Sequence, residues 1–326
     1  PIEPLLPPEG APNVLVILLD DVGYGASSAF GGPVATPTAE RLQGGGLTYN
    51  RFHTTALCAP TRAALLSGRN HHSVGMGMIT ETATAAPGSS GLRPNTKAAL
   101  PITLKLNGYA TAQFGKCHEV PPWQTSPVGP FDSWPTGGGG FEYFYGFIGG
   151  ENNQYDPALY EGTTPIEPPA TEEEGYHLTE DLVDETIRMI QDQQQATTRK
   201  PFFAYLATGA AHAPHQVAPE WVEPYRGAFD HGWEAYREEV FARQVAAGVV
   251  PEDTVLTPRP AWVPEWSTLS ADQQRLYARY MEVFAGFMTH TDHHLGRLFD
   301  FLEEIGVAED TVVMILSDNG ASAEGG

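Results

Sequence analysis

Four short, largely apolar runs constrain the fold of this 326-residue chain more than any other feature of its sequence. Continuous runs of this length are typical of strands buried on both faces of a parallel sheet. Helical patterns lie between them, over 181–195 and about 270–305. We therefore predict an α/β fold with a large, mostly parallel sheet flanked by helices on both faces. The predicted strands are NVLVILL (13–19), ATAQF (110–114), FFAYLAT (202–208) and TVVMILS (311–317).

The sequence predicts one large domain that is preceded by a short N-terminal arm. Residues 1–12 are a proline-rich arm, and the α/β domain is expected to span 13–326. Segments near 119–175 and 213–268 are rich in Pro, Gly and aromatic residues, so we expect surface insertions there. Their aromatic side chains either wall an apolar pocket or anchor packed loops.

Charge and composition exclude several classes of function. Forty acidic residues against 18 basic ones give a formal net charge of −22. A nucleic-acid partner requires a dense basic surface and is not expected. A small anionic substrate would need local positive charge from Lys, Arg, His or a divalent cation. No apolar run approaches the roughly 20 residues that cross a bilayer, so no membrane association is expected.

The compartment is only weakly indicated by the sequence. Two cysteines, Cys58 and Cys117, do not make a disulfide framework. No signal peptide is visible, because the first residues lack a basic start and an apolar middle. A cytoplasmic location is therefore favoured, although the chain does not begin with Met and a removed signal would leave no trace.

Polar side chains follow each of the four predicted strands. In open parallel sheets the carboxyl ends of the strands form the ligand crevice, so these side chains are expected to meet at one edge. Each motif alone is also compatible with a helix cap or a turn. Together their oxygen ligands favour calcium or magnesium over zinc. The motifs are Asp20-Asp21, Gly115-Lys116-Cys117-His118, His212-Ala213-Pro214-His215 and Asp318-Asn319-Gly320.

Cys58 lies in a different context, at the start of an Ala- and Leu-rich segment. Pro60 favours the first turn of a helix, so Cys58 is expected at a helix N-terminus. The unpaired N–H groups of such a terminus attract anions. Two interpretations follow: a reactive thiolate of lowered pKa, or a small buried residue without reactivity.

Two segments resemble a known family. CAPTRAALLSG (58–68) and GYATAQFGKCH (108–118) resemble the two signatures of the type I sulfatases, the arylsulfatases of the alkaline phosphatase superfamily. The resemblance runs from Asn13 to the last residue and includes FFAYL and SDNG. It implies a sulfatase-like α/β fold and the hydrolysis of a small sulfated substrate.

The resemblance also implies individual roles. Cys58 would be oxidised to formylglycine by a formylglycine-generating enzyme; one hydroxyl of its hydrate attacks the sulfur, and the second later expels sulfate. Arg62 would hold the modified side chain, and His118 would act as the base in elimination. Lys116 and His212 would bind sulfate, and His212 would protonate the leaving oxygen. The implied ligands of Ca²⁺, or alternatively Mg²⁺, are Asp20, Asp21, the modified Cys58, Asp318 and Asn319.

The sequence departs from the family pattern in three places. Cys117 and Glu119 stand where the family has Trp and Leu-Gly around the histidine, and we interpret Cys117 as a small buried residue. Two histidines compete in AHAPH, where the spacing from FFAYL favours His212 over His215. The family's later sulfate-binding lysine and its smaller C-terminal domain have no counterpart in this sequence.

Three alternatives accompany this interpretation. His290 and His294 have the spacing of a zinc pair but lack the glutamate of that motif, so a solvated helix face is the preferred interpretation. A phosphonate monoester or phosphodiester hydrolase of the same superfamily would use nearly the same site. A non-enzymatic binding protein would keep Cys58 unmodified and use the metal site structurally.

Overall fold

The computed structural model describes residues 5–197 and 199–322 and divides into two compact units. Unit 1 comprises Pro1–Asp21, Thr54–Pro214 and Arg297–Gly326. Unit 2 comprises Val22–His53 and His215–Gly296. The preferred site residues of the strand-end motifs, from Asp20 to Asn319, fall in unit 1, whereas the competing His215 falls in unit 2.

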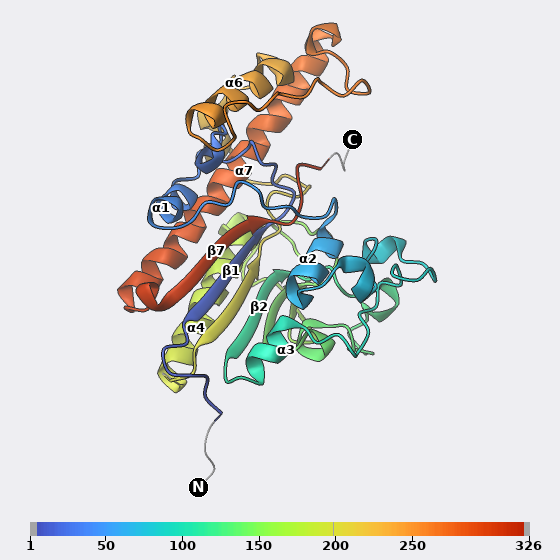
Figure 1. The fold of residues 1–326 in the computed structure, drawn as a ribbon, viewed down its shortest axis with the longest axis vertical. Coiled ribbons are helices and arrows are strands. Elements are labelled where there is room, and N and C mark those ends of the chain that lie inside the picture. Colours follow the sequence, from blue (N-terminus) through green and yellow to red (C-terminus); the bar gives the residue numbers. More distant parts are fainter. Residues whose placement is uncertain (1–4, 198, 323–326) are drawn as a thin grey trace. The chain divides into compact units, whose positions relative to one another are not determined.

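Unit 1 is built on a seven-stranded mixed sheet in the order β5-β4-β3-β2-β6-β1-β7 (Figure 1). The five strands from β3 to β7 in that order are parallel, and β4 and β5 pair antiparallel at one edge. The mostly parallel α/β sheet and the positions of all four predicted strands are thus confirmed. Burial on both faces is wrong for β7, because it is an edge strand on which Val312 and Met314 stay exposed. The strands are β1 (Asn13–Leu19), β2 (Ala110–Lys116), β3 (Tyr143–Phe147), β4 (Leu159–Glu161), β5 (Thr164–Ile166), β6 (Phe202–Ala207) and β7 (Thr311–Ser317).

Segment 119–175, expected as a surface insertion, contributes β3, β4 and β5 to this sheet. The sequence of β3, YFYGF, has a glycine where a buried strand usually has a branched residue. Gly146 allows the two backbones to approach, since a Cβ there would lie 2.1 Å from the carbonyl oxygen of Gly115 on β2. A close approach between strands distant in sequence leaves no periodic pattern, which is why β3 was missed.

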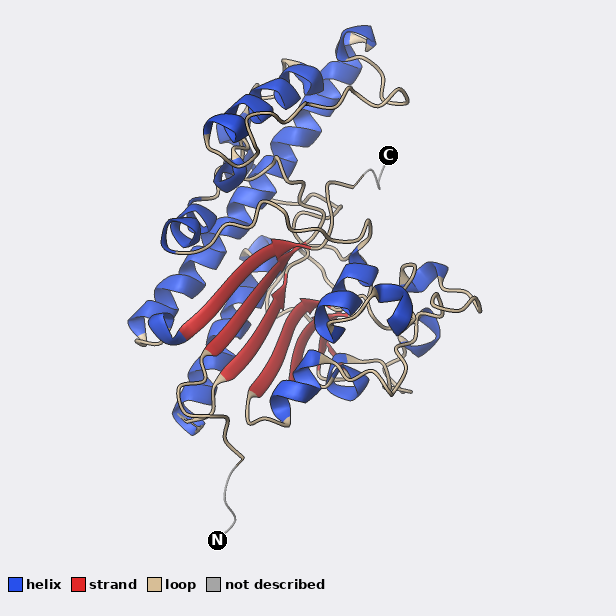
Figure 2. Ribbon diagram, in the orientation of Figure 1, coloured by secondary structure: helices blue, strands red, loops and turns tan. Residues whose placement is uncertain are grey.

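Helices cover both faces of the sheet (Figure 2). α4 packs against β2, β3 and β6, whereas α2 and α3 contribute Leu65, Leu66 and Leu104 to the core on the opposite face. The helix predicted over 181–195 is confirmed as α4. The α-helices of unit 1 are α2 (Cys58–Ser67), α3 (Leu100–Lys105) and α4 (Leu178–Ala196). Its shorter helices are η2 (His71–Val74), η3 (Thr80–Thr82), η4 (Pro122–Gln124), η5 (Pro135–Gly139), η6 (Glu172–Glu174) and η9 (Ala308–Asp310).

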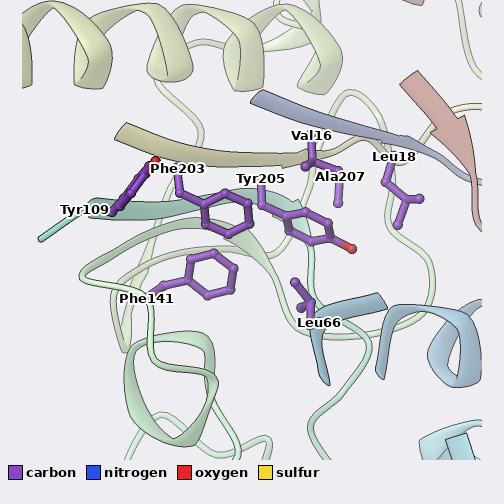
Figure 3. Packing of buried hydrophobic residues seen from close by; sticks show 8 residues of the cluster. All are labelled: Val16, Leu18, Leu66, Tyr109, Phe141, Phe203, Tyr205 and Ala207. Carbon is purple, nitrogen blue, oxygen red and sulfur yellow. The ribbon is translucent and has the colours of Figure 1, made fainter. Parts of the chain in front are cut away.

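An aromatic cluster fills the core between the sheet and α2 (Figure 3). Phe203 and Tyr205 project from β6 on the same face, because alternate residues of a strand point to the same side. The ring of Phe141 stacks on both, with centroids 6.0 Å from Phe203 and 6.1 Å from Tyr205. Leu66 of α2 closes the cluster and so anchors the helix that begins with Cys58.

Trp134 shows how the aromatic residues of segment 119–175 are used. Its ring is fully buried and packs edge-on against Phe131 and Tyr160. Its indole N–H donates to the carbonyl oxygen of Gln124 at 2.7 Å. For this residue the structure supports the loop-anchor interpretation over the pocket wall.

Unit 2 is helical and includes most of segment 213–268. Asp292 accepts hydrogen bonds from the backbone N–H groups of Thr38 and Ala39 and thereby caps α1. The elements of unit 2 are η1 (Ser28–Phe30), α1 (Pro37–Gly45), α5 (Pro219–Val222), η7 (Glu223–Tyr225), α6 (Gly232–Ala246), η8 (Trp266–Thr268) and residues 271–296 of α7.

The helix predicted over about 270–305 is confirmed as α7 (Ala271–Glu304). The interpretation of its His290 and His294 as a solvated face is wrong, because both are buried and their rings lie against Trp221. When polar residues of a helix are covered by another segment of the chain, the sequence of the helix itself does not reveal that they are buried. Within the described ranges, neither α7 nor any other helix is long and apolar enough to cross a membrane.

The aromatic cluster provides a test of the fold. Phe203→Ala should lower the free energy of unfolding by about 3–5 kcal/mol, because it removes a fully buried ring and leaves a cavity. Leu106→Ala, at an exposed leucine of the same unit, should change it by less than about 0.5 kcal/mol. Denaturant unfolding of both variants measures the difference, and equal stabilities would contradict the packing described.

Candidate active site

The carboxyl ends of β1, β2, β6 and β7 meet at one edge of the sheet, as the strand-end motifs predict. Backbone hydrogen bonds hold the segments together beyond the strands: Asp20 N–H donates to Ala210 O at 2.8 Å, and Asp318 N–H donates to Leu19 O at 3.0 Å. The structure therefore brings together side chains that are almost 300 residues apart in sequence.

Cys58 is the first residue of α2, as predicted from Pro60. Its N-cap, Leu57, is extended and offers no side-chain cap. The Cys58 thiol is buried, and burial raises its pKa above the usual value, although Lys116 and Arg62 act in the opposite direction. Of the two interpretations from sequence, its burial favours the small buried residue over a thiolate of lowered pKa.

Two buried cations are paired with buried carboxylates beside Cys58. Arg62, one turn along α2, donates from Nε and Nη2 to Oδ2 of Asp318 at 3.0 and 2.7 Å. Lys116, at the end of β2, donates from Nζ to Oδ2 of Asp20 at 2.6 Å. All four side chains are fully buried. Arg62 also donates from Nη1 to the carbonyl oxygen of Lys116, which joins the two pairs.

The two carboxyl groups respond differently to this environment. Burial raises the pKa of Asp20 to about 6, against the opposing charges of Lys116 and Arg62. Burial also acts on Asp318, but Arg62 and Lys116 hold its pKa below the usual value. Asp20 therefore takes up a proton as the pH falls through about 6, whereas Asp318 keeps its charge to a lower pH.

The oxygen atoms that remain fit a divalent cation. Oδ1 of Asp20 and Oδ1 of Asn319 are buried and have no hydrogen-bond partner among the described residues. Asn319 instead donates from Nδ2 to Oδ1 of Asp21 at 2.5 Å. Asp20, Cys58 and Asp318 each offer a ligand atom, and these atoms lie within 4.8 Å of one another. Carboxylate and amide oxygens in such a cluster suit calcium or magnesium.

His212 lies among these residues. Its Nε2 is 3.6 Å from Oδ2 of Asp21, and its Nδ1 is 2.7 Å from the carbonyl oxygen of Ala213. Because a carbonyl only accepts, Nδ1 carries a hydrogen and donates it. His215, the competing histidine, belongs to unit 2, where its ring packs edge-on against Phe284.

His118 contacts Cys58 directly and has a second partner that the sequence did not indicate. Its Nδ1 lies 2.9 Å from the Sγ atom of Cys58, and its Nε2 lies 2.9 Å from Oε2 of Glu81. Burial lowers the pKa of His118, so the neutral ring donates a hydrogen bond to the carboxylate at neutral pH. Glu81 lies in η3, away from any strand end, and no spacing or composition signal marks it.

Backbone strain concentrates at the same site. Asp21 and His118, with φ of 59° and 52°, have the left-handed backbone that non-glycine residues rarely adopt. Each follows a strand end and turns its side chain toward the other residues of the site: Asp21 toward Asn319 and His118 toward Cys58. Such conformations cost about 1–3 kcal/mol and persist where surrounding contacts impose them.

Cys117, between Lys116 and His118, is directed to a different place. It packs with Val120, Trp134 and other apolar residues, and burial raises the pKa of its thiol to about 12. Alternate residues of an extended chain face opposite sides, which explains why Cys117 points away from its two neighbours. The interpretation of a small buried residue is confirmed.

Comparison with known proteins matches residues 12–326 to the family model described as Sulfatase. An arylsulfatase of Klebsiella aerogenes is 31% identical over 320 residues, which cover 95% of this chain and 66% of that protein. The chain spans about half to two thirds of the length of the curated relatives that it matches over 95% of itself.

Two solved structures share the fold at low identity. The sulfatase candidate yidJ of Bacteroides fragilis is 18% identical with a TM-score of 0.72, covering 96% of this chain and 63% of that one. A phosphonate monoester hydrolase of Agrobacterium radiobacter is 19% identical with a TM-score of 0.58, covering 95% and 62%. At these identities the likeness concerns the fold alone.

The thiols provide a test of the site's electrostatics. In protein that retains both cysteines, neither Cys58 nor Cys117 should react with iodoacetamide at pH 7, because burial keeps both thiols protonated. Protein unfolded in guanidinium should be labelled at both, as measured by peptide mass spectrometry. Rapid labelling of Cys58 in the native protein would contradict a raised pKa.

Proposed function

We propose, on the premise that this chain belongs to the sulfatase family, that it hydrolyses sulfate esters at the site around residue 58. The observation that most supports this is the position of Cys58 at the tip of α2, 2.9 Å from His118 and close to the Arg62 and Lys116 pairs. A nucleophile so placed has a base and positive charge within reach.

Residue 58 would act in modified form. As hydrated formylglycine it would supply a hydroxyl that attacks sulfur while Asp318 takes the proton and the S–O bond to the alcohol breaks. The second hydroxyl would then lose its proton to His118, its electron pair would form the aldehyde C=O, and the C–O bond to sulfate would break. Arg62 orients that side chain, and Lys116 balances the charge of the sulfate group. His118 accepts a proton at Nδ1, and His212 binds sulfate and protonates the leaving oxygen from its second nitrogen.

A divalent cation completes the proposed site. Asp20, Asp21, Asp318 and Asn319, with residue 58, would hold calcium or alternatively magnesium, which polarises the sulfate oxygens when bound. Oδ1 of Asn319 and Oδ1 of Asp20 support this assignment, since both lack a hydrogen-bond donor among the described residues, although Oδ1 of Asp20 lies 3.5 Å from Nη2 of Arg62. Hydrogen bonds from Arg62 and Lys116 hold the carboxylates of Asp318 and Asp20 in place, which is compatible with their proposed role as ligands.

The cation would also reverse the sign of the charge that an anionic substrate meets at this site. Three carboxyl groups face the two cationic side chains at this edge of the sheet, so the formal balance is one excess negative charge. A divalent cation changes it to one excess positive charge. The site then attracts an anion even though the whole chain carries −22.

The alternative function is the hydrolysis of phosphonate monoesters or phosphodiesters. The fold likeness to the hydrolase of Agrobacterium radiobacter favours it, whereas the family match and the arylsulfatase relative favour sulfate esters. A small sulfated substrate, maturation by a formylglycine-generating enzyme, the absence of nucleic-acid and membrane partners and a cytoplasmic location stay predictions.

Activity measurements on the full-length protein, matured in a host that converts Cys58, test the proposal. We expect turnover of 4-nitrophenyl sulfate to exceed that of bis(4-nitrophenyl) phosphate and of a phenylphosphonate monoester. Cys58→Ala should lower turnover by at least about a thousandfold, because the nucleophile is lost. Cys117→Ala, a matched thiol outside the site, should retain activity. Dominant phosphodiester or phosphonate turnover, or an active Cys58→Ala variant, would overturn the assignment.

Calcium binding can be measured without substrate. Addition of Ca²⁺ to chelator-treated protein should raise the melting temperature, since a ligand at 100 times its Kd stabilises the folded state by about 2.7 kcal/mol. Asn319→Ala should reduce that shift because it removes an orphaned ligand oxygen. Asp132→Asn, at an exposed carboxylate, should leave the shift intact. Equal shifts in all three proteins would place the cation elsewhere.

A further inference from the structure

Glu81 is the one carboxylate of the described site that the proposed reaction does not use. It lies in the 3-10 helix η3 (Thr80–Thr82), on a segment that contributes no strand to the sheet. Its side chain is about half exposed, whereas the His118 ring that it contacts is almost completely buried. Thr80 donates from Oγ1 to the same Oε2 atom at 3.1 Å, which restricts the carboxylate rotamer.

The contact determines which nitrogen of His118 carries hydrogen. A glutamate carboxylate is ionised at neutral pH and only accepts hydrogen bonds. Nε2, at 2.9 Å from Oε2, must therefore be the protonated nitrogen of the neutral ring. Nδ1 is then left as an acceptor, and it is this atom that lies 2.9 Å from Sγ of Cys58.

Two further contacts hold the imidazole in place. The His118 backbone N–H donates to Ile148 O at 3.1 Å, which continues the pairing of β2 with β3. Gly150 lies against the ring face: a Cβ at this position would be 2.8 Å from Cε1 and 2.9 Å from Nε2. The ring is thus confined by the β3 side of the sheet, by Glu81 and by residue 58.

We propose that Glu81 is the positioning residue of this site: its carboxylate holds His118 in the Nε2–H tautomer, so that Nδ1 faces residue 58 as the base. This assignment deepens the proposed sulfatase function and rests on it for its catalytic part. When Nδ1 takes the proton of a hydroxyl at position 58, the ring becomes a cation between that oxygen and the Glu81 carboxylate. The proton leaves Nδ1 to solvent water, which restores the neutral tautomer.

The kinetic test compares variants in the matured full-length protein. Glu81→Ala should lower kcat about 10- to 100-fold, the range for residues that orient a histidine ligand. KM should stay nearly unchanged, because the proposed role of Glu81 is exerted through His118 and not on the substrate. Glu81→Gln should recover part of the loss, since its amide oxygen accepts from Nε2–H without the charge. Mass spectrometry of residue 58 ensures that every variant is equally converted.

A second variant and a matched control separate positioning from a general disturbance. Gly150→Ala should lower kcat as Glu81→Ala does, because the added methyl displaces the ring. Glu151→Ala removes a neighbouring carboxylate that is exposed and has no hydrogen bond or ion pair to His118 in the described chain, so its kcat should equal that of the wild type. Unchanged kcat in Glu81→Ala, or a loss confined to KM, would overturn the proposal.

A spectroscopic measurement tests, without any activity assay, whether Glu81 holds His118 in the Nε2–H tautomer. In ¹⁵N-histidine-labelled protein with Cys58 unconverted, long-range ¹H–¹⁵N spectra should show His118 as the Nε2–H tautomer. Glu81→Ala should produce a mixture with the Nδ1–H form, whereas Glu151→Ala should not. An unchanged His118 tautomer in Glu81→Ala would refute the role of Glu81. If instead the wild type hydrolysed no sulfate ester, the proposed function would fail while this result would stand.

Discussion

Buried ion pairs at the carboxyl edge of the sheet are the interaction on which the site depends. Arg62 and Lys116 are completely buried and could not remain charged there without Asp318 and Asp20. Removal of one partner from such a pair typically costs about 3–5 kcal/mol, because an uncompensated charge is left behind. The pairs therefore couple helix α2 to the ends of β1, β2 and β7.

This coupling positions the proposed nucleophile. Cys58 is one turn before Arg62, so the docking of the guanidinium on Asp318 also sets where the start of α2 lies. Leu66 anchors the other end of the helix in the aromatic core. The helix is held at one end by charge and at the other by apolar packing. Little freedom remains for the residue at its tip.

The left-handed residues Asp21 and His118 have a related role. Each lies two residues past the end of a strand, β1 for Asp21 and β2 for His118. Parallel hydrogen bonding to neighbouring strands fixes the backbone of both strands. A left-handed turn there redirects the chain and directs the side chain toward the other residues of the site. The left-handed backbone lowers the free energy of unfolding at these positions, and the buried contacts around them compensate for this loss.

The four strands β1, β2, β6 and β7, the start of α2 and the sheet edge that carries the site could all be predicted from the sequence. The apolar runs determined β1, β2 and β6, because burial on both faces requires continuous apolar residues. The fourth run also forms a strand, β7, but this strand lies at the edge of the sheet and leaves Val312 and Met314 exposed. Pro60 determined the start of α2, and the polar residues after each strand indicated the edge of the sheet where they meet. Local composition and spacing are sufficient for these features.

Only the tertiary structure decided the pairing of β3 with β2 through Gly115 and Gly146, the burial of His290 and His294, and the contact of Glu81 with His118. It also placed His215 in unit 2 and raised the pKa of Cys58 instead of lowering it. Each of these depends on a neighbour that is distant in the chain. Local sequence encodes the type and position of most helices and strands, whereas which of their residues are covered, and by which group, is decided by the packing of the folded chain.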